Sequence, residues 1–84
     1  MDESKAIEYL MHFGMSRQEA TVYLRLIEAG KQTGYEIARD TGISRSNVYA
    51  SLAALVEKGA AYLVEEDAKR YIPVHVQEFC GNRI

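Results

Sequence analysis

Residues 35–55 read YEIARDTGISRSNVYASLAAL, a pattern that predicts two short helices joined by a tight turn. Gly42 can take the left-handed backbone conformation that ends a helix, and Ser44 can cap the helix that follows. Ile43 stands between them, where an apolar side chain can fill the angle between the helices. Two helices joined in this way form a helix-turn-helix, whose second helix commonly enters a DNA groove.

The second helix of this motif is expected over residues 45–58. Val48, Leu52 and Leu55 recur at helical spacing, so they should form its buried face. The opposite face carries side chains that are small or able to form hydrogen bonds, namely Ser46, Asn47, Ala50 and Ala54. Such a face lets a helix approach the floor of a groove. We therefore predict that residues 45–58 are a recognition helix that lies in the major groove.

Two further helices are predicted upstream. The first covers about residues 4–13 and ends at Gly14, and the second begins after Ser16 and ends at Gly30. Periodic apolar positions predict their buried stripes, which are Ile7, Leu10 and Met11 in the first and Ala20, Tyr23, Leu24 and Ile27 in the second.

Capping boxes predict where two of the helices begin. Ser16 and Glu19 have the required spacing, and so do Thr33 and Glu36. The second pair opens a short helix to about residue 41, with Ile37 and Ala38 expected inside.

After Gly59 the apolar period changes from helical to alternating. Residues 61–66 and 69–75 are expected to be two strands around a polar turn, with Pro73 at an edge position. The fold class is therefore mainly α with a small β-hairpin (α+β). It is a winged helix-turn-helix of about four helices followed by a two-stranded wing. Residues 1–75 are expected to form this domain, and residues 76–84 to begin a dimerisation or linker helix.

Composition limits the class of protein. The 84 residues are 48% hydrophobic with one proline, which favours a single globular domain over a disordered chain. No apolar run approaches about 20 residues and the N-terminus is acidic, so neither a membrane span nor a signal peptide is expected. A lone Cys80 permits no internal disulfide and no cysteine-rich zinc site. We expect a cytoplasmic protein with no membrane partner.

The net charge of −2 argues mildly against binding to nucleic acid. Its distribution is uneven, since residues 1–30 hold three cations against five carboxylates, whereas residues 31–59 hold four against three. The helix-turn-helix half is the less acidic one. This weak asymmetry is compatible with a DNA-binding face that carries few cations.

Five segments, in this order, resemble the winged-helix domain of TrmB-type transcriptional regulators. The resemblance covers roughly residues 5–75 and implies a homodimer that binds operator DNA through its recognition helix and wing. Longer members of that family add a C-terminal sugar-sensing domain, so a small-molecule effector is not expected to bind this chain alone. The segments are GMSRQEATVYL (14–24), GYEIA (34–38), ISRSNVY (43–49), LVEKG (55–59) and KRYIPV (69–74).

The residues predicted to contact double-stranded DNA come from the recognition helix and the wing, and they are Ser44, Arg45, Ser46, Asn47, Tyr49, Ala50, Lys69 and Arg70. Arg45 either reaches a phosphate or a guanine edge or is simply solvated. Ser44 is a helix cap with a phosphate contact as a second role. Asn47 either makes a bidentate contact to adenine or bonds back to Ser44.

The flank and the wing leave similar alternatives. Tyr49 either meets the DNA backbone with its hydroxyl or packs against the wing. Lys69 and Arg70 follow the wing turn, where they either meet a minor groove or phosphate or remain solvated.

No enzymatic motif stands out. The sequence has no phosphate-binding loop, nucleophile elbow or zinc-protease signature, so we expect a protein that is not an enzyme and has no metal or cofactor. The alternative function is a winged-helix module that binds other proteins and never touches DNA, which the net acidity slightly favours. Against it, the residues predicted to contact DNA would share one face of a winged fold.

A homodimer is expected because a single small domain makes few phosphate contacts, whereas two copies can meet half-sites one helical turn apart. The candidate interface uses the first helix, where Tyr9 and Phe13 add apolar area, and the C-terminal segment, where Phe79 needs cover.

Overall fold

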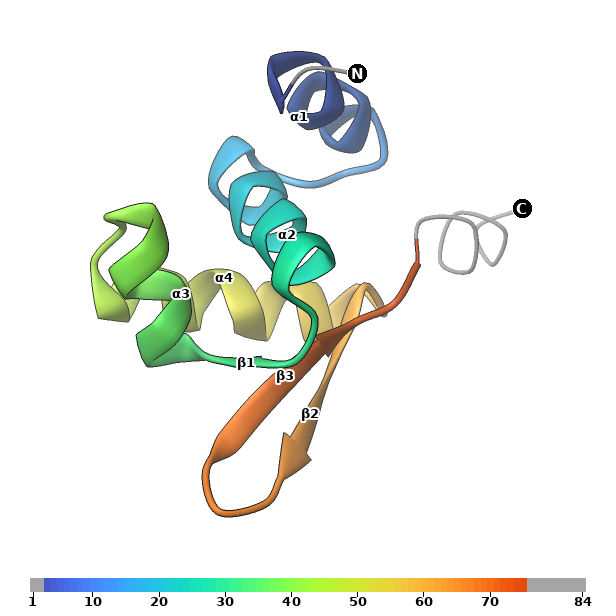
Figure 1. Cartoon of the computed structure of the whole chain (residues 1–84). Coiled ribbons are helices and arrows are strands. Elements are labelled where there is room, and N and C mark those ends of the chain that lie inside the picture. Colours follow the sequence, from blue (N-terminus) through green and yellow to red (C-terminus); the bar gives the residue numbers. More distant parts are fainter. Residues whose placement is uncertain (1–2, 76–84) are drawn as a thin grey trace.

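The structure, a computed structural model, describes residues 3–75. Figure 1 shows helices gathered around α2, with a β-hairpin projecting below them. No helix in this described part is long and apolar enough to cross a membrane. In chain order the elements are α1 (Glu3–His12), α2 (Arg17–Ala29), β1 (Gln32–Thr33), α3 (Gly34–Thr41), α4 (Arg45–Glu57), β2 (Ala61–Glu65) and β3 (Lys69–Pro73).

Local signals fix the helix boundaries as predicted. The Ser16 hydroxyl accepts a hydrogen bond from the Glu19 N–H at 3.1 Å, and the Glu19 carboxylate accepts one from the Ser16 N–H at 3.0 Å. Thr33 and Glu36 repeat this reciprocal pair at the start of α3. Gly42 ends α3 in the left-handed conformation, with φ of 77°. Both capping boxes and the turn of the helix-turn-helix are therefore confirmed.

The core lies where α2 meets the other elements. Val48, Leu52 and Leu55 of α4 are fully buried, as predicted, and so are Tyr23 of α2 and Ile37 of α3. Buried alanines and aliphatic side chains complete the core, among them Ile7, Leu10, Val22 and Leu26.

Two residues of the predicted stripes are exposed, and a third, Leu24, is partly buried against the core. Met11 and Ile27 are exposed, so these two assignments were wrong. Helix α1 packs mainly against α2, and this contact buries Ile7 and Leu10. Helix α2 touches α1, α3, α4 and β3, and its buried face is therefore rotated toward Val22 and away from Ile27.

The sheet has three strands rather than two. Its order is β1-β3-β2 and all neighbours are antiparallel. Strand β1 adds the pairs Gln32↔Tyr71 and Thr33↔Arg70, which attach the start of α3 to the wing. Pro73 therefore lies on the central strand, so the expected edge position was wrong. The strand tolerates a proline there because β1 pairs only with Tyr71 and Arg70, which leaves the β1 side of Pro73 without a strand partner.

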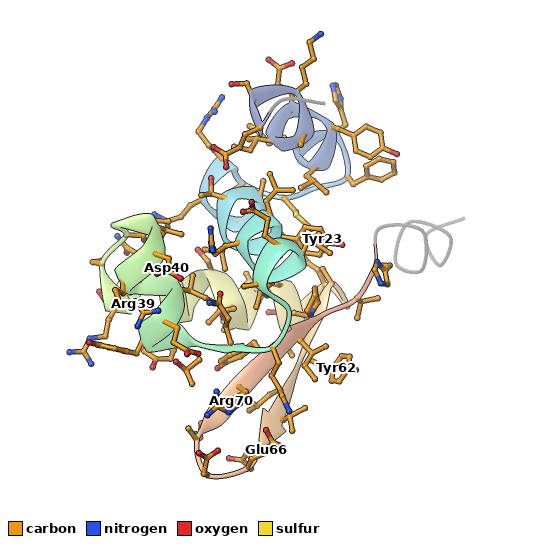
Figure 2. All side chains as sticks on the ribbon, in the orientation of Figure 1. Tyr23, Arg39, Asp40, Tyr62, Glu66 and Arg70 are labelled. Atoms are coloured by element: carbon orange, nitrogen blue, oxygen red, sulfur yellow. The ribbon has the colours of Figure 1, made fainter. Side chains whose placement is uncertain are left out.

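A hydrogen bond ties the wing to the centre of the core. The hydroxyl of the fully buried Tyr23 donates to the Val74 carbonyl at 2.6 Å. The bond joins α2 to the residue that follows β3, and Figure 2 shows Tyr23 between the helices and the end of the hairpin. The hairpin is thereby held against the helices, which a two-stranded hairpin needs for stability.

Removal of the Tyr23 hydroxyl should therefore destabilise the fold. Tyr23→Phe leaves the Val74 carbonyl without this donor, and we expect the free energy of unfolding in urea to fall by about 1–2 kcal/mol. The matched control is Tyr62→Phe, because Tyr62 is an exposed tyrosine on β2, and its effect should stay within about 0.5 kcal/mol. Equal stability of Tyr23→Phe and the unmodified chain would show that the wing does not depend on this bond.

Candidate nucleic-acid interface

The N-terminal end of α4 carries no negative side chain of its own. Ser44 is its cap, and its hydroxyl accepts a hydrogen bond from the Asn47 N–H at 3.4 Å. Helices α2 and α3 each have a glutamate in the first turn, whereas α4 has no acidic residue there. The partial positive charge of the α4 N-terminus is therefore available to an anion from outside the domain.

The exposed face of α4 has the character expected from the sequence. Ser46, Asn47 and Ala50 are exposed, opposite the buried Val48 and Leu52. The Asn47 side-chain amide forms no hydrogen bond with any residue of the described part, so its donor and acceptor both face outward. This face is small in profile and polar at its N-terminal end.

The cations of residues 31–75 fall into two groups. Lys31 pairs with Glu66 at 3.0 Å, Arg39 with Asp40 at 3.1 Å, and Lys58 with Glu19. Among the lysines and arginines of this stretch, Arg45 and Lys69 form no ion pair with a described residue. These two positive charges are left available at the start of α4 and at the start of β3.

Arg70 is surrounded by carboxylates. Its guanidinium lies 3.7 Å from Glu36, 3.7 Å from Glu66 and 3.4 Å from Asp67, and its side chain is only 25% exposed. Figure 2 shows Arg70 and Glu66 near the tip of the wing. The pairing of Thr33 with Arg70 brings Glu36 to this position. The positive charge of Arg70, one of the two wing cations expected from the sequence, is therefore compensated within the domain.

Glu36 remains ionised in this cluster. The hydrogen bond from the Thr33 N–H lowers the pKa of Glu36, burial opposes that shift, and the Thr33 hydroxyl and the nearby Arg70 and Arg39 add to the lowering. The carboxylate therefore both caps α3 and holds the Arg70 charge at neutral pH.

Two aromatic contacts join the start of α3 to the first turns of α4. The Arg45 guanidinium lies over the Tyr35 ring, 5.3 Å from its centroid. The Tyr49 ring packs on Gly34 so closely that a methyl group there would come within 2.4 Å of Tyr49 Cε1. We call Gly34, Tyr35, Arg45 and Tyr49 the tyrosine clasp.

Half of the tyrosine clasp could not be predicted from the sequence. Gly34 and Tyr35 were not predicted as part of the site, although Tyr35 is an exposed aromatic in the first turn of α3. A tyrosine in the first turn of a helix was the available signal, but its contact with α4, and that of the buried Gly34, depend on how the two helices cross. Tyr49 packs on Gly34 at the start of α3, and it also lies near Tyr71 of the wing strand β3, whose pKa is raised by burial and, to a smaller extent, by Tyr49.

The candidate dimer residues lie elsewhere. The Tyr9 and Phe13 rings are 5.1 Å apart and tilted by 59°. Tyr9 is exposed, whereas Phe13 packs against the core. Helix α1 lies at the end of the domain opposite the wing (Figure 1). Phe79 and the segment 76–84 lie outside the described residues.

Within the described part, no cluster of three or more histidines, cysteines or carboxylates could hold a metal ion.

Comparison with known proteins places the chain in a family. A family model described as "Sugar-specific transcriptional regulator TrmB" matches residues 10–77. The chain belongs to this family, as the sequence resemblance indicated.

Relatives match over most of this chain but over a small part of their own length. An uncharacterized protein of Bacillus subtilis (strain 168), YrhO, is 30% identical over 77 residues, which is 92% of this chain and 28% of that protein. The HTH-type sugar sensing transcriptional regulator TrmBL1 of Pyrococcus furiosus is 28% identical over 75 residues, 89% of this chain and 22% of that protein.

A solved structure shows the same fold. TrmBL2, described as an archaeal chromatin protein with a novel mode of DNA binding, superposes with a TM-score of 0.87 and 27% identity. The match covers 96% of this chain and 32% of that one. The winged helix-turn-helix is therefore confirmed, and the chain spans less than a third of each of these relatives.

Because of the close packing in the tyrosine clasp, Gly34→Ala should move the Tyr49 ring with little change in the free energy of unfolding. The added methyl should push the Tyr49 ring into solvent, while alanine's better helix propensity offsets the lost contact, so stability should change by less than about 1 kcal/mol. The Tyr49 ring resonances in an NMR spectrum should nevertheless move. In a Tyr49→Ala background the clash is absent, and Gly34→Ala should then be stabilising by up to about 1 kcal/mol. Unchanged Tyr49 resonances would contradict this close packing.

Proposed function

We propose that this chain binds double-stranded DNA as the DNA-reading domain of a transcriptional regulator, with no enzymatic activity of its own. The observation that carries the proposal is the N-terminal end of α4. It has no acidic residue in its first turn, it bears Arg45 without a carboxylate partner in the described part, and it adjoins a small polar face. A cation at a helix N-terminus opposes the helix dipole, so its placement favours a role toward an external anion over one in stability.

In the proposed complex α4 lies in the major groove. Ser46 and Ala50 are small enough to let the helix approach the bases, and Asn47 has the amide geometry that pairs with adenine. The Ser44 turn and the N-terminal N–H groups of α4 would meet a phosphate. Support comes from the relatives TrmBL1 and TrmBL2, whose descriptions name transcriptional regulation and DNA binding.

The wing is proposed to contact DNA more weakly than α4. Residues 65–70 hold three carboxylates and two cations, and one of those cations, Arg70, is already surrounded by carboxylates. Lys69 is therefore the wing residue best suited to reach a phosphate or the minor groove. Arg70 would contribute only if its carboxylates moved away.

We propose DNA binding over the alternative, a module that binds only protein. The exposed face of the N-terminal half of α4, residues 45–50, lacks the large apolar or acidic side chains that such a module would present, apart from Tyr49 on its flank. We propose no cofactor, metal or small-molecule effector for this chain.

A chromosomal regulator in organisms such as the bacterial and archaeal relatives would act in the cytoplasm.

A homodimer is part of the proposal. Tyr9 and Met11 of α1 and Ile27 of α2 are exposed, and α1 lies away from the wing and α4 (Figure 1). A surface between two copies on this side would leave both recognition helices accessible. Two-fold symmetry would then place them on half-sites about one helical turn apart.

Salt dependence tests the proposed DNA contacts. With Arg45 and Lys69 on phosphates, the slope of log K against log salt on duplex DNA should be about −2 for each chain bound, and Arg45→Ala should make it shallower by about 1. Asn47→Ala is the matched control, because it should keep the slope and relax the preference at one base position by about 1–3 kcal/mol. Binding that ignores salt and both cations would instead support the protein-binding module.

Sedimentation tests the proposed dimer. At micromolar concentration the 84-residue chain should sediment as a dimer, or become one on a duplex that carries two half-sites. Tyr9→Ser should shift it toward monomer without a change in fold, because Tyr9 is exposed. A chain that stays monomeric with and without DNA would rule out a dimer formed by these residues.

A further inference from the structure

An exposed tyrosine lies against the arginine that the proposed function depends on. Tyr35 is 53% exposed and therefore contributes little to the core. Its ring nevertheless lies under the Arg45 guanidinium, at a Cζ-to-centroid distance of 5.3 Å. This is within the range of about 6 Å over which an aromatic face attracts a guanidinium.

The backbone holds the two residues in this relation. Gly42 in its left-handed conformation fixes the turn between α3 and α4. At the other end of α3, the Tyr49 ring rests on Gly34, the residue before Tyr35. The first turn of α3 is thus fixed against the first two turns of α4, so the contact between Tyr35 and Arg45 does not rely on two freely moving side chains.

The contact holds Arg45 without adding a negative charge beside it. Arg70 is held by three carboxylates, and their negative charges compensate its own positive charge. A tyrosine ring attracts a cation through its π-face but has no net negative charge. Arg45 also donates no hydrogen bond to a described residue, so its N–H donors remain available for a phosphate or a guanine edge.

We propose that Tyr35 is a positioning residue of the DNA-binding surface, which holds the Arg45 guanidinium at the start of α4 without a compensating carboxylate. The surface then extends from α4 onto the first turn of α3. This inference rests on the proposed DNA binding and adds a residue to it. Tyr35 acts through Arg45, and its ring face is the part that matters.

The variants separate the ring from the hydroxyl. Tyr35→Phe keeps the ring and Tyr35→Ala removes it. Tyr62→Ala is the matched control, because Tyr62 is 50% exposed and points away from α3 on the far side of the hairpin (Figure 2). Far-ultraviolet circular dichroism checks that each variant keeps its fold.

Two measurements are made on each variant. In the absence of DNA, NMR of the Arg45 side-chain protons reports the ring current of Tyr35. Their shifts should be kept in Tyr35→Phe and Tyr62→Ala and should move toward those of a solvated arginine in Tyr35→Ala. Titration with a nonspecific duplex at low salt should give a two- to fivefold weaker affinity for Tyr35→Ala, on the order expected for an exposed cation–π contact. Tyr35→Phe and Tyr62→Ala should bind like the unmodified chain.

A double-mutant cycle decides whether Tyr35 acts through Arg45. In the Arg45→Ala background, Tyr35→Ala should have no further effect on affinity. The inference is wrong if the two losses add, if Tyr35→Phe weakens binding as much as Tyr35→Ala, or if Tyr35→Ala binds normally. Failure of the unmodified chain to bind any duplex would overturn the proposed function and this inference together. The titration of the unmodified chain alone distinguishes this outcome from the others.

Discussion

The packing of α4 against α2 is the interaction on which the rest of the structure depends. Val48, Leu52 and Leu55 are fully buried on one side of α4, so the opposite side must face solvent. Because the helix is fixed in rotation by these three contacts, Asn47 and its small neighbours are presented together. Tyr23 of α2 also holds the end of β3, and the position of the wing therefore follows from the same core.

Two arginines near this surface show how local electrostatics decides what a cation can do. Arg70 sits among Glu36, Glu66 and Asp67, where it stabilises the junction between α3 and the wing. Arg45 lies over an aromatic ring and keeps its charge unpaired within the described part. A chain with a net charge of −2 can still offer a positive site in this way, because binding at short range depends on the few charges at the surface rather than on the total.

Signals carried by nearby residues could be predicted from the sequence, and contacts between distant segments could not. Ser16, Thr33 and Gly42 defined helix ends correctly, because a cap involves only a few successive residues. Strand β1 was missed because a two-residue strand has no periodicity and forms only through β3. Helical periodicity likewise could not reveal the neighbours of α2, which left Ile27 misplaced. The carboxylates around Arg70 and the ring beneath Arg45 also required the tertiary structure.

We propose that the N-terminal half of α4 and the first turn of α3 meet DNA. Amide chemical-shift mapping of the ¹⁵N-labelled chain during titration with a short duplex tests it most directly. We expect the largest shifts at residues 44–50 and at Tyr35, smaller shifts at Lys69, and on α1 only those that dimer formation on the duplex causes. Shifts concentrated on α1, or no shifts on α4 at saturating duplex, would contradict it.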